Sequence, residues 1–148
     1  MMTYGVAGKQ KSHAEVFTPA GLVFEMILQD GLREVLKDVD KTILDPAVGE
    51  GQFPCAELVM KLFYNIERLD EELALRALKS LYGIDIQEWS VERARAHLLL
   101  TLQDAYRFFT GKEFTRLDEA QEIVGRNMII GDSLKLLKEW ANPQGALF

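Results

Sequence analysis

The chain has few of the residues that crosslinks and metal sites require, with one cysteine and two histidines among its 148 residues. The lone cysteine, Cys55, excludes an internal disulfide framework and a multi-cysteine metal site, and it is typical of a reducing compartment. No apolar run approaches the roughly 18 to 20 residues of a membrane span, and no signal peptide is recognisable. We therefore expect a cytoplasmic protein with no metal and no membrane partner, with Cys55 packed in a helix and His97 at a surface or boundary.

Positive charge is also scarce, because 17 lysines and arginines face 23 aspartates and glutamates, for a formal net charge of −6. Binding to duplex DNA depends largely on neutralising its phosphates, so this balance is unfavourable for a chain that holds DNA by itself. Hydrophobic residues make up 48% and charged residues 27%, which is typical of a folded globular domain. The length suits one domain with its own core and is too short for two.

Three short apolar segments are expected to be strands, and an acidic residue follows each: residues 42–44, 81–84 and 128–130. Helical patterns fill the intervals between and after them, over about 52–66, 70–80, 88–103, 118–124 and 133–140. Strands that alternate with helices predict an α/β fold with a parallel sheet and right-handed crossovers. The least regular stretch, 104–117, is expected to be a surface excursion before the third strand.

The N-terminal part divides near residue 15. Residues 1–14 are polar and without periodicity, and we expect them to form a flexible N-terminal arm, with one domain over 15–148. Thr18 and Pro19 are residue types of a helix N-cap and first helical position, and an apolar helical stripe follows them. Gly31 is expected to interrupt this helix before a further short helical segment.

The most informative segment is residues 45–53 (DPAVGEGQF), here called the glycine loop, which lies directly after the first expected strand and before a helix. Two glycines two positions apart let the backbone turn tightly and let a ligand approach the N–H groups at the helix start. The alternative is a glycine-rich connecting turn with Asp45 as a local cap. The segment matches neither the G-x-G-x-x-G fingerprint nor a P-loop.

Two further acidic residues follow the other expected strands. Asp85 closes the second strand, where doubly wound folds bind ribose hydroxyls, and its alternative role is to cap the next helix. Asp132 follows the third strand, where it could accept a hydrogen bond from an adenine amino group while Ser133 caps the next helix, and the alternative is a capping role only. Acidic residues at the carboxyl ends of three successive parallel strands line one edge of an open sheet, where such folds bind ligands.

The glycine loop resembles the S-adenosylmethionine-binding loop of adenine-specific DNA methyltransferases of restriction–modification systems and phages, in its D-P-x-x-G-x-G-x-F form. Upstream, residues 15–19 (EVFTP) are similar to the F-T-P element of that family, and residues 81–86 and 127–134 resemble its next two elements in order. The resemblance covers about residues 13–137. It implies a Rossmann-like class I methyltransferase fold, of which the chain holds the first half: about three strands with flanking helices, preceded by an N-terminal helix.

The resemblance implies that S-adenosyl-L-methionine is the cofactor and that these residues bind it: Phe17, Thr18, Asp45, Ala47, Gly49, Gly51, Asp85, Ile86 and Asp132. The first two would close over the methionine part, and the loop residues would form the floor under the amino acid and the sulfonium. Asp85 would accept from the ribose hydroxyls, Ile86 would pack against the adenine ring, and Asp132 would receive the adenine amino group. For Ile86, and for Phe53 beneath the loop, packing in the core is an equal alternative.

The catalytic element of the family, [DNS]-P-P-[YFW] after a fourth strand, does not occur in this sequence. Residues 142–145 (NPQG) follow a helical pattern and lack both the second proline and the aromatic residue, so we interpret them as a helix-ending turn. We therefore expect no catalytic residue here, and we expect a missing C-terminal segment or a partner chain to supply catalysis and the DNA contacts.

Two functions are compatible with these patterns. The first is the cofactor-binding part of an adenine-specific DNA methyltransferase, completed by that segment, by a second copy of the chain, or by a methyltransferase or specificity subunit. The methyl group would then pass directly to the amine of a flipped adenine. The alternative is a non-catalytic remnant that acts as a cofactor-binding or protein-interaction module, because a half-sheet leaves an open edge that favours docking.

Overall fold

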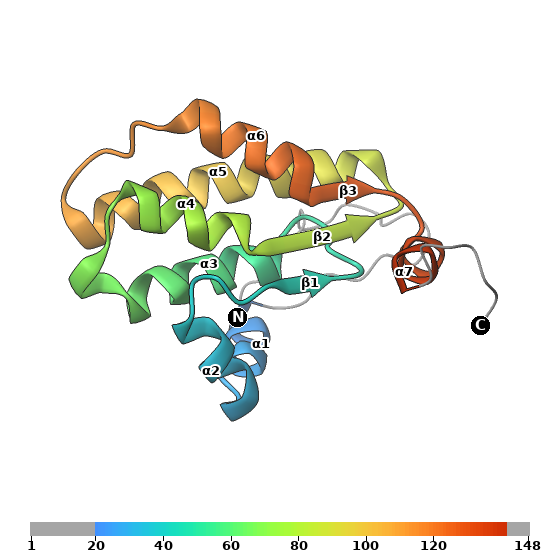
Figure 1. The fold of residues 1–148 in the computed structure, drawn as a ribbon, viewed down its shortest axis with the longest axis horizontal. Helices are drawn as coiled ribbons and strands as arrows, with labels where there is room; N and C mark the ends of the chain where they lie inside the picture. The colour runs from blue at the N-terminus through green and yellow to red at the C-terminus, as the bar shows by residue number, and fades with distance from the viewer. Residues whose placement is uncertain (1–19, 142–148) are drawn as a thin grey trace.

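The computed structural model describes residues 20–141, which form an open parallel sheet with helices around it (Figure 1). Over that range three strands pair in the order β1 (Ile43–Asp45), β2 (Leu81–Asp85) and β3 (Met128–Ile130). Both pairings are parallel. The expected α/β fold with a parallel sheet is therefore confirmed, and it is compatible with a Rossmann-like architecture. The arm over 1–14 and the F-T-P element lie outside the described residues.

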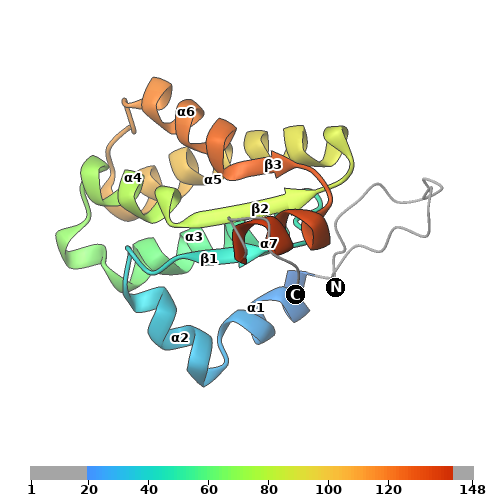
Figure 2. The ribbon, with the colours of Figure 1, turned by 45° about the vertical axis from the view of Figure 1, so that its right-hand side comes forward.

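Helices precede, connect and follow the strands. They are α1 (Ala20–Ile27), α2 (Asp30–Lys37), α3 (Gln52–Tyr64), the short 3-10 helix η1 (Ile66–Arg68), α4 (Glu71–Lys79), α5 (Glu88–Thr110), α6 (Leu117–Asn127) and α7 (Ser133–Ala141). Helices α3 and α5 pack together behind the sheet, and α1 and α2 lie beside β1, where they contact α3 (Figure 1). Helix α7 lies near the carboxyl ends of β1 and β2 (Figure 2). None of the helices in the described part of the chain is long and apolar enough to cross a membrane.

The main core lies between the sheet and these helices. Leu81 of β2 and Met128 of β3 are fully buried there, together with Leu58 of α3 and Leu98 of α5. A smaller cluster joins α1, α2 and α3, and Phe53 packs against it. Phe53 therefore takes the core-packing role that the sequence left open.

Two expected boundaries are wrong. Helix α5 continues to Thr110, so the first part of the stretch expected to be irregular is helical, because Tyr106 is buried in the core and Gly111 ends the helix with a φ of +72°. The break between α1 and α2 falls before Gly31, which lies inside α2, since Gln29 adopts the extended conformation that precedes a helix.

A buried lysine, Lys61 of α3, holds the amino-terminal end of the sheet. Its Nζ donates hydrogen bonds to the carbonyl of Asp38 (3.0 Å), the carbonyl of Lys41 (2.6 Å) and the hydroxyl of Ser80 (2.8 Å). Burial lowers the pKa of Lys61 to about 8, and the nearby Asp38 opposes this shift. One ammonium thus ties the chain before β1 and the residue before β2 to the same helix.

Replacing Lys61 tests this anchor. Lys61→Met is expected to lower the free energy of unfolding by about 3 kcal/mol, because buried acceptors lose their charged donor. Urea unfolding followed by circular dichroism measures the change. The matched control is Lys79→Met at an exposed position of α4, with an expected change of about 0.5 kcal/mol or less. Equal unfolding midpoints for the two variants would contradict the assigned role.

Candidate functional site

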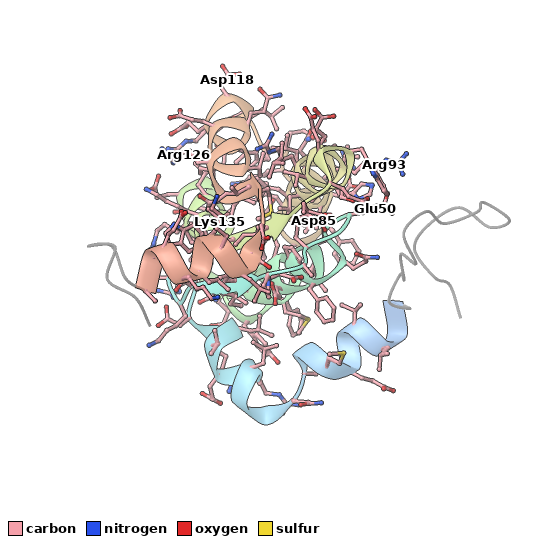
Figure 3. The ribbon with its side chains drawn as sticks, turned by 90° about the vertical axis from the view of Figure 1, so that its right-hand side faces the viewer. Glu50, Asp85, Arg93, Asp118, Arg126 and Lys135 are labelled. Carbon is pink, nitrogen blue, oxygen red and sulfur yellow. The ribbon has the colours of Figure 1, made fainter. Side chains whose placement is uncertain are left out.

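The acidic residues that follow the three strands meet at the carboxyl edge of the sheet. Asp45 and Asp85 end β1 and β2, and Asp132 comes two residues after β3. Parallel strands carry their carboxyl ends to the same edge, which Figure 3 shows facing the viewer. The structure therefore brings these residues to one edge of the sheet, and their part in binding a ligand stays a prediction.

The glycine loop is seated on the middle strand. The Val48 N–H donates to the carbonyl of Ile84 at 2.9 Å, which fixes the loop above the end of β2. A Cβ at Gly83 would lie 2.6 Å from Val48 Cγ2 and 2.9 Å from Met128 Sδ, closer than atoms can approach. Gly83 is therefore required so that Val48 can pack directly on the strand.

The two glycines of the loop also have specific backbone requirements. Gly49 and Gly51 have φ values of +56° and +91°, in the left-handed region that favours glycine. A Cβ at Gly51 would lie 3.2 Å from Ala94 Cα, so the loop runs tightly against α5. Gly51 is also the N-cap of α3 and makes no side-chain capping bond, and because Pro54 has no N–H, the uncapped N–H groups at the start of α3 are those of Gln52 and Phe53.

Asp85 joins the loop to the start of α5. Its Oδ2 accepts the Gly49 N–H at 3.0 Å, and its Oδ1 accepts the Gln87 N–H at 2.9 Å. The N-cap of α5 is Gln87, so Asp85 forms a turn before the helix and does not cap it. Each carboxylate oxygen can accept more than one hydrogen bond, so Asp85 can hold the loop and still receive hydroxyl donors.

Asp45 is half-buried where β1 meets the loop. Its Oδ1 accepts the Ala47 N–H at 3.0 Å, which is the local cap that the sequence offered as an alternative. Burial raises the pKa of Asp45, the Ala47 hydrogen bond lowers it, and the neighbouring Asp85 raises it further. Two carboxylates that raise each other's energy in this way favour a positively charged ligand group beside them.

Asp132 and Ile86 lie in more open positions. Asp132 Oδ1 accepts the N–H groups of Leu134 (3.0 Å) and Lys135 (3.3 Å), so Asp132 caps α7 and the expectation of a Ser133 cap is wrong. The physical reason is that Ser133 is already the first helical residue. Ile86 is 72% exposed, so its core-packing alternative is wrong as well, and it presents an apolar surface at the edge.

Two residues of α5 that hold the glycine loop, Arg93 and His97, were not predicted from the sequence. The Glu50 carboxylate forms an ion pair with Arg93 Nη1 at 2.7 Å, and His97 Nδ1 lies 2.7 Å from the Glu50 carbonyl oxygen. Figure 3 shows Arg93 reaching Glu50 at the side of the edge. The signal was present in the spacing, because Arg93 and His97 are four residues apart and share one face of a helix.

Two buried polar atoms at the start of α5 have no hydrogen-bond partner among the described residues. Within residues 20–141, Gln87 Oε1 and Ser90 Oγ are buried and have no hydrogen-bond partner. Buried polar groups in proteins are nearly always paired, so unpaired atoms call for an explanation such as a ligand. Gln87 and Ser90 follow Asp85 by two and five residues, so the unpaired hydrogen-bonding capacity lies at the start of α5.

A cavity of about 220 Å³ lies behind the loop, between α3 and α5. Its lining includes Gly51, His97 and Cys55. Burial raises the pKa of the Cys55 thiol to about 11, which agrees with a packed and unreactive cysteine. In the described ranges no cluster of three or more histidine, cysteine, aspartate or glutamate residues could hold a metal ion.

Glu57 of α3 is a buried carboxyl that the sequence did not single out. Its side chain lies one helical turn before Lys61, and the residue is 4% exposed. Burial raises the pKa of Glu57 to about 7, with Asp45 adding to the shift and Lys61 opposing it. The negative charge near Asp45 therefore changes close to neutral pH.

This shift makes a prediction about stability and pH. The pKa of Glu57 is higher in the folded chain than its ordinary value of 4.5, so ionisation destabilises the fold, from about pH 4.5 up to about pH 7. Glu57→Gln should match the wild type at acidic pH and be more stable by about 2 kcal/mol at alkaline pH. Urea unfolding at both pH values measures the difference. A difference that does not change with pH would contradict the buried-carboxyl account.

Comparison with known proteins gives one weak relationship. The chain is 40% identical over 82 residues to a protein of Methanocaldococcus jannaschii that carries the name of a type II restriction enzyme and methyltransferase. The match covers 48% of this chain and 7% of that protein, so the chain spans a small part of its relative's length. No family model matches the chain, and no solved structure matches it. The similarity supports a relationship to restriction–modification methyltransferases.

Proposed function

We propose that this chain is the S-adenosyl-L-methionine-binding part of a site-specific DNA methyltransferase that acts on the exocyclic amine of adenine. The observation that carries the proposal is the glycine loop, which is held between β2 and α5 with Asp45 and Asp85 beside it. The relationship to a restriction enzyme and methyltransferase supports the same class of activity.

The chemistry of the edge fits each part of this cofactor. The sulfonium and the ammonium are positive and would lie near the half-buried Asp45, while the carboxylate suits the uncapped N–H groups that start α3. The ribose hydroxyls suit Asp85, and the unpaired Gln87 Oε1 offers a further acceptor nearby. The adenine ring suits the exposed Ile86.

The other implied contacts involve Asp132, the loop backbone and the F-T-P element. Asp132 is exposed after β3, where its carboxylate could accept from the adenine amino group while it caps α7. The N–H groups of Ala47, Gly49 and Gly51 already donate to Asp45, Asp85 and the Val48 carbonyl, so these residues would contribute close approach of the loop backbone to the cofactor. Phe17 and Thr18 lie outside the described residues, so their contact with the methionine part rests on the resemblance alone.

The cofactor supplies an activated methyl group on its sulfonium, and transfer to a flipped adenine amine depends mainly on positioning. The residues of this chain would bind and orient the donor. The catalytic [DNS]-P-P-[YFW] element and the DNA contacts would come from a segment or partner outside this sequence. A second copy, a methyltransferase subunit or a specificity subunit are the candidates for that partner.

A non-catalytic module is the alternative function. It is favoured by the absence of the catalytic tetrapeptide from the sequence and by exposed apolar side chains. Leu44 of β1, Ile130 of β3 and Leu134 of α7 are 37%, 44% and 72% exposed. Transfer of a labelled methyl group to adenine in DNA, in the presence of a segment that carries the catalytic element, separates the two functions. The alternative requires that no label is transferred.

Isothermal titration with S-adenosyl-L-methionine tests the proposal directly. We expect saturable binding by the wild-type chain and loss of binding in Asp45→Ala. The substitution removes the carboxylate that would lie beside the positively charged sulfonium and ammonium of the cofactor. Asp118→Ala is the control, since Asp118 is an exposed carboxylate on α6, away from the edge (Figure 3). Failure of a well-folded wild-type chain to bind would refute the proposal.

Ile86 separates a binding role from a structural one. Because Ile86 is 72% exposed, Ile86→Ala should leave thermal unfolding unchanged while lowering cofactor affinity by about fivefold through lost contact with the adenine ring. The control is Phe108→Ala, which removes a still more exposed apolar side chain at the opposite end of α5. Equal cofactor affinities of Ile86→Ala and Phe108→Ala would show that Ile86 does not contact the cofactor.

A further inference from the structure

Glu50 is an acidic residue buried inside a loop. Its side chain is 5% exposed, although it lies between two glycines in a connection that should be open to solvent. Carboxylates are almost never buried unless a cation compensates them, since desolvation of the charge is unfavourable. Arg93 Nη1 lies 2.7 Å from Glu50 Oε1, and the Arg93 side chain remains 47% exposed. The ion pair therefore fixes a loop charge against α5.

The backbone of the same residue is held as well. His97 Nδ1 lies 2.7 Å from the Glu50 carbonyl oxygen, so Nδ1 carries the proton and donates it. Arg93 and His97 are one helical turn apart and face the loop together. Between these contacts Gly51 packs against the backbone of Ala94. One face of α5 thus holds Glu50 through both its side chain and its main chain.

Trp89 extends this face by one more turn. The guanidinium carbon of Arg93 lies 5.2 Å from the centre of the Trp89 ring, a cation–π contact that helps to orient the arginine. Trp89 is 39% exposed and lies near the start of α5. The stack limits the rotamers from which Arg93 can reach Glu50.

Helix α5 also follows closely on the residue that holds the other side of the loop. It begins three residues after Asp85, whose Oδ2 accepts the Gly49 N–H. Gly49 is therefore held from the end of β2 and Glu50 is held from α5, while both glycines of the loop have high intrinsic freedom. Contacts that order such a loop before a ligand arrives remove an entropic penalty from binding.

We infer that Arg93 is a positioning residue for the cofactor loop and that it acts through Glu50 without touching the ligand. The inference rests on the proposed function, because it assigns to Arg93 and Glu50 part of the affinity for S-adenosyl-L-methionine. The ion pair keeps Gly49 and Gly51 in the conformation in which the Gly49 N–H donates to Asp85 and the Gly51 N–H donates to the Val48 carbonyl.

Titration of four variants and one control variant with S-adenosyl-L-methionine tests the inference. Arg93→Met and Glu50→Gln should each weaken cofactor binding by about tenfold, and the double variant should be no weaker than either one, because both remove the same contact. Arg93→Lys keeps the charge and should recover most of the affinity. Arg126→Met, which removes an exposed arginine from the Arg126–Glu122 pair on α6, is the matched control.

Hydrogen–deuterium exchange distinguishes positioning from loss of the fold. In Arg93→Met the amides of residues 47–51 should exchange faster, while those of β2 and the middle of α5 stay protected, with the cofactor absent. Wild-type affinity in Arg93→Met, additive losses in the double variant, or unchanged loop exchange would each overturn the inference. If the wild-type chain does not bind the cofactor, the proposed function fails, and so does the claim that Arg93 and Glu50 contribute to cofactor affinity. Faster exchange of the loop amides in Arg93→Met would then still show that the ion pair orders the loop.

Discussion

The contact of Val48 with Gly83 is the constraint on which the edge of the sheet depends. Because the middle strand has no side chain at that point, the loop after β1 can lie directly on β2 and form a hydrogen bond with the Ile84 carbonyl. Only from this position can Gly49 reach Asp85 and Gly51 reach α5. The contacts of the loop with Asp85 and with α5 therefore depend on the close approach of the loop to β2 at Gly83.

Much of the fold could be predicted because its signals are local. The segments 81–84 and 128–130 are apolar, short and bounded by helical patterns, and they became β2 and β3 within one residue. Parallel pairing followed from the alternation, and it brought Asp45 and Asp85 to one edge without any knowledge of contacts. The glycine loop was equally visible, since its two glycines stand at a strand–helix junction.

What the sequence could not supply depends on tertiary contacts. The burial of Glu50 is decided by a residue 43 positions away, and nothing in the loop itself distinguishes a buried carboxylate from a solvated one. Glu57 and Lys61 have the spacing of an ordinary surface pair, yet both are buried in the folded chain. The capping of α7 was assigned to Ser133 because serine and aspartate are both good caps, and the helix start decides between them.

The position of β1 has a consequence for how the site would be enclosed. Among the described strands, β1 pairs with β2 alone, and Asp45 stands at its carboxyl end. A polypeptide that added a strand beside β1 would continue the sheet and, by the same geometry, raise a wall next to Asp45. The same added strand would then both extend the sheet and enclose the bound molecule. The residence time of a ligand would therefore increase when the added polypeptide is bound to β1.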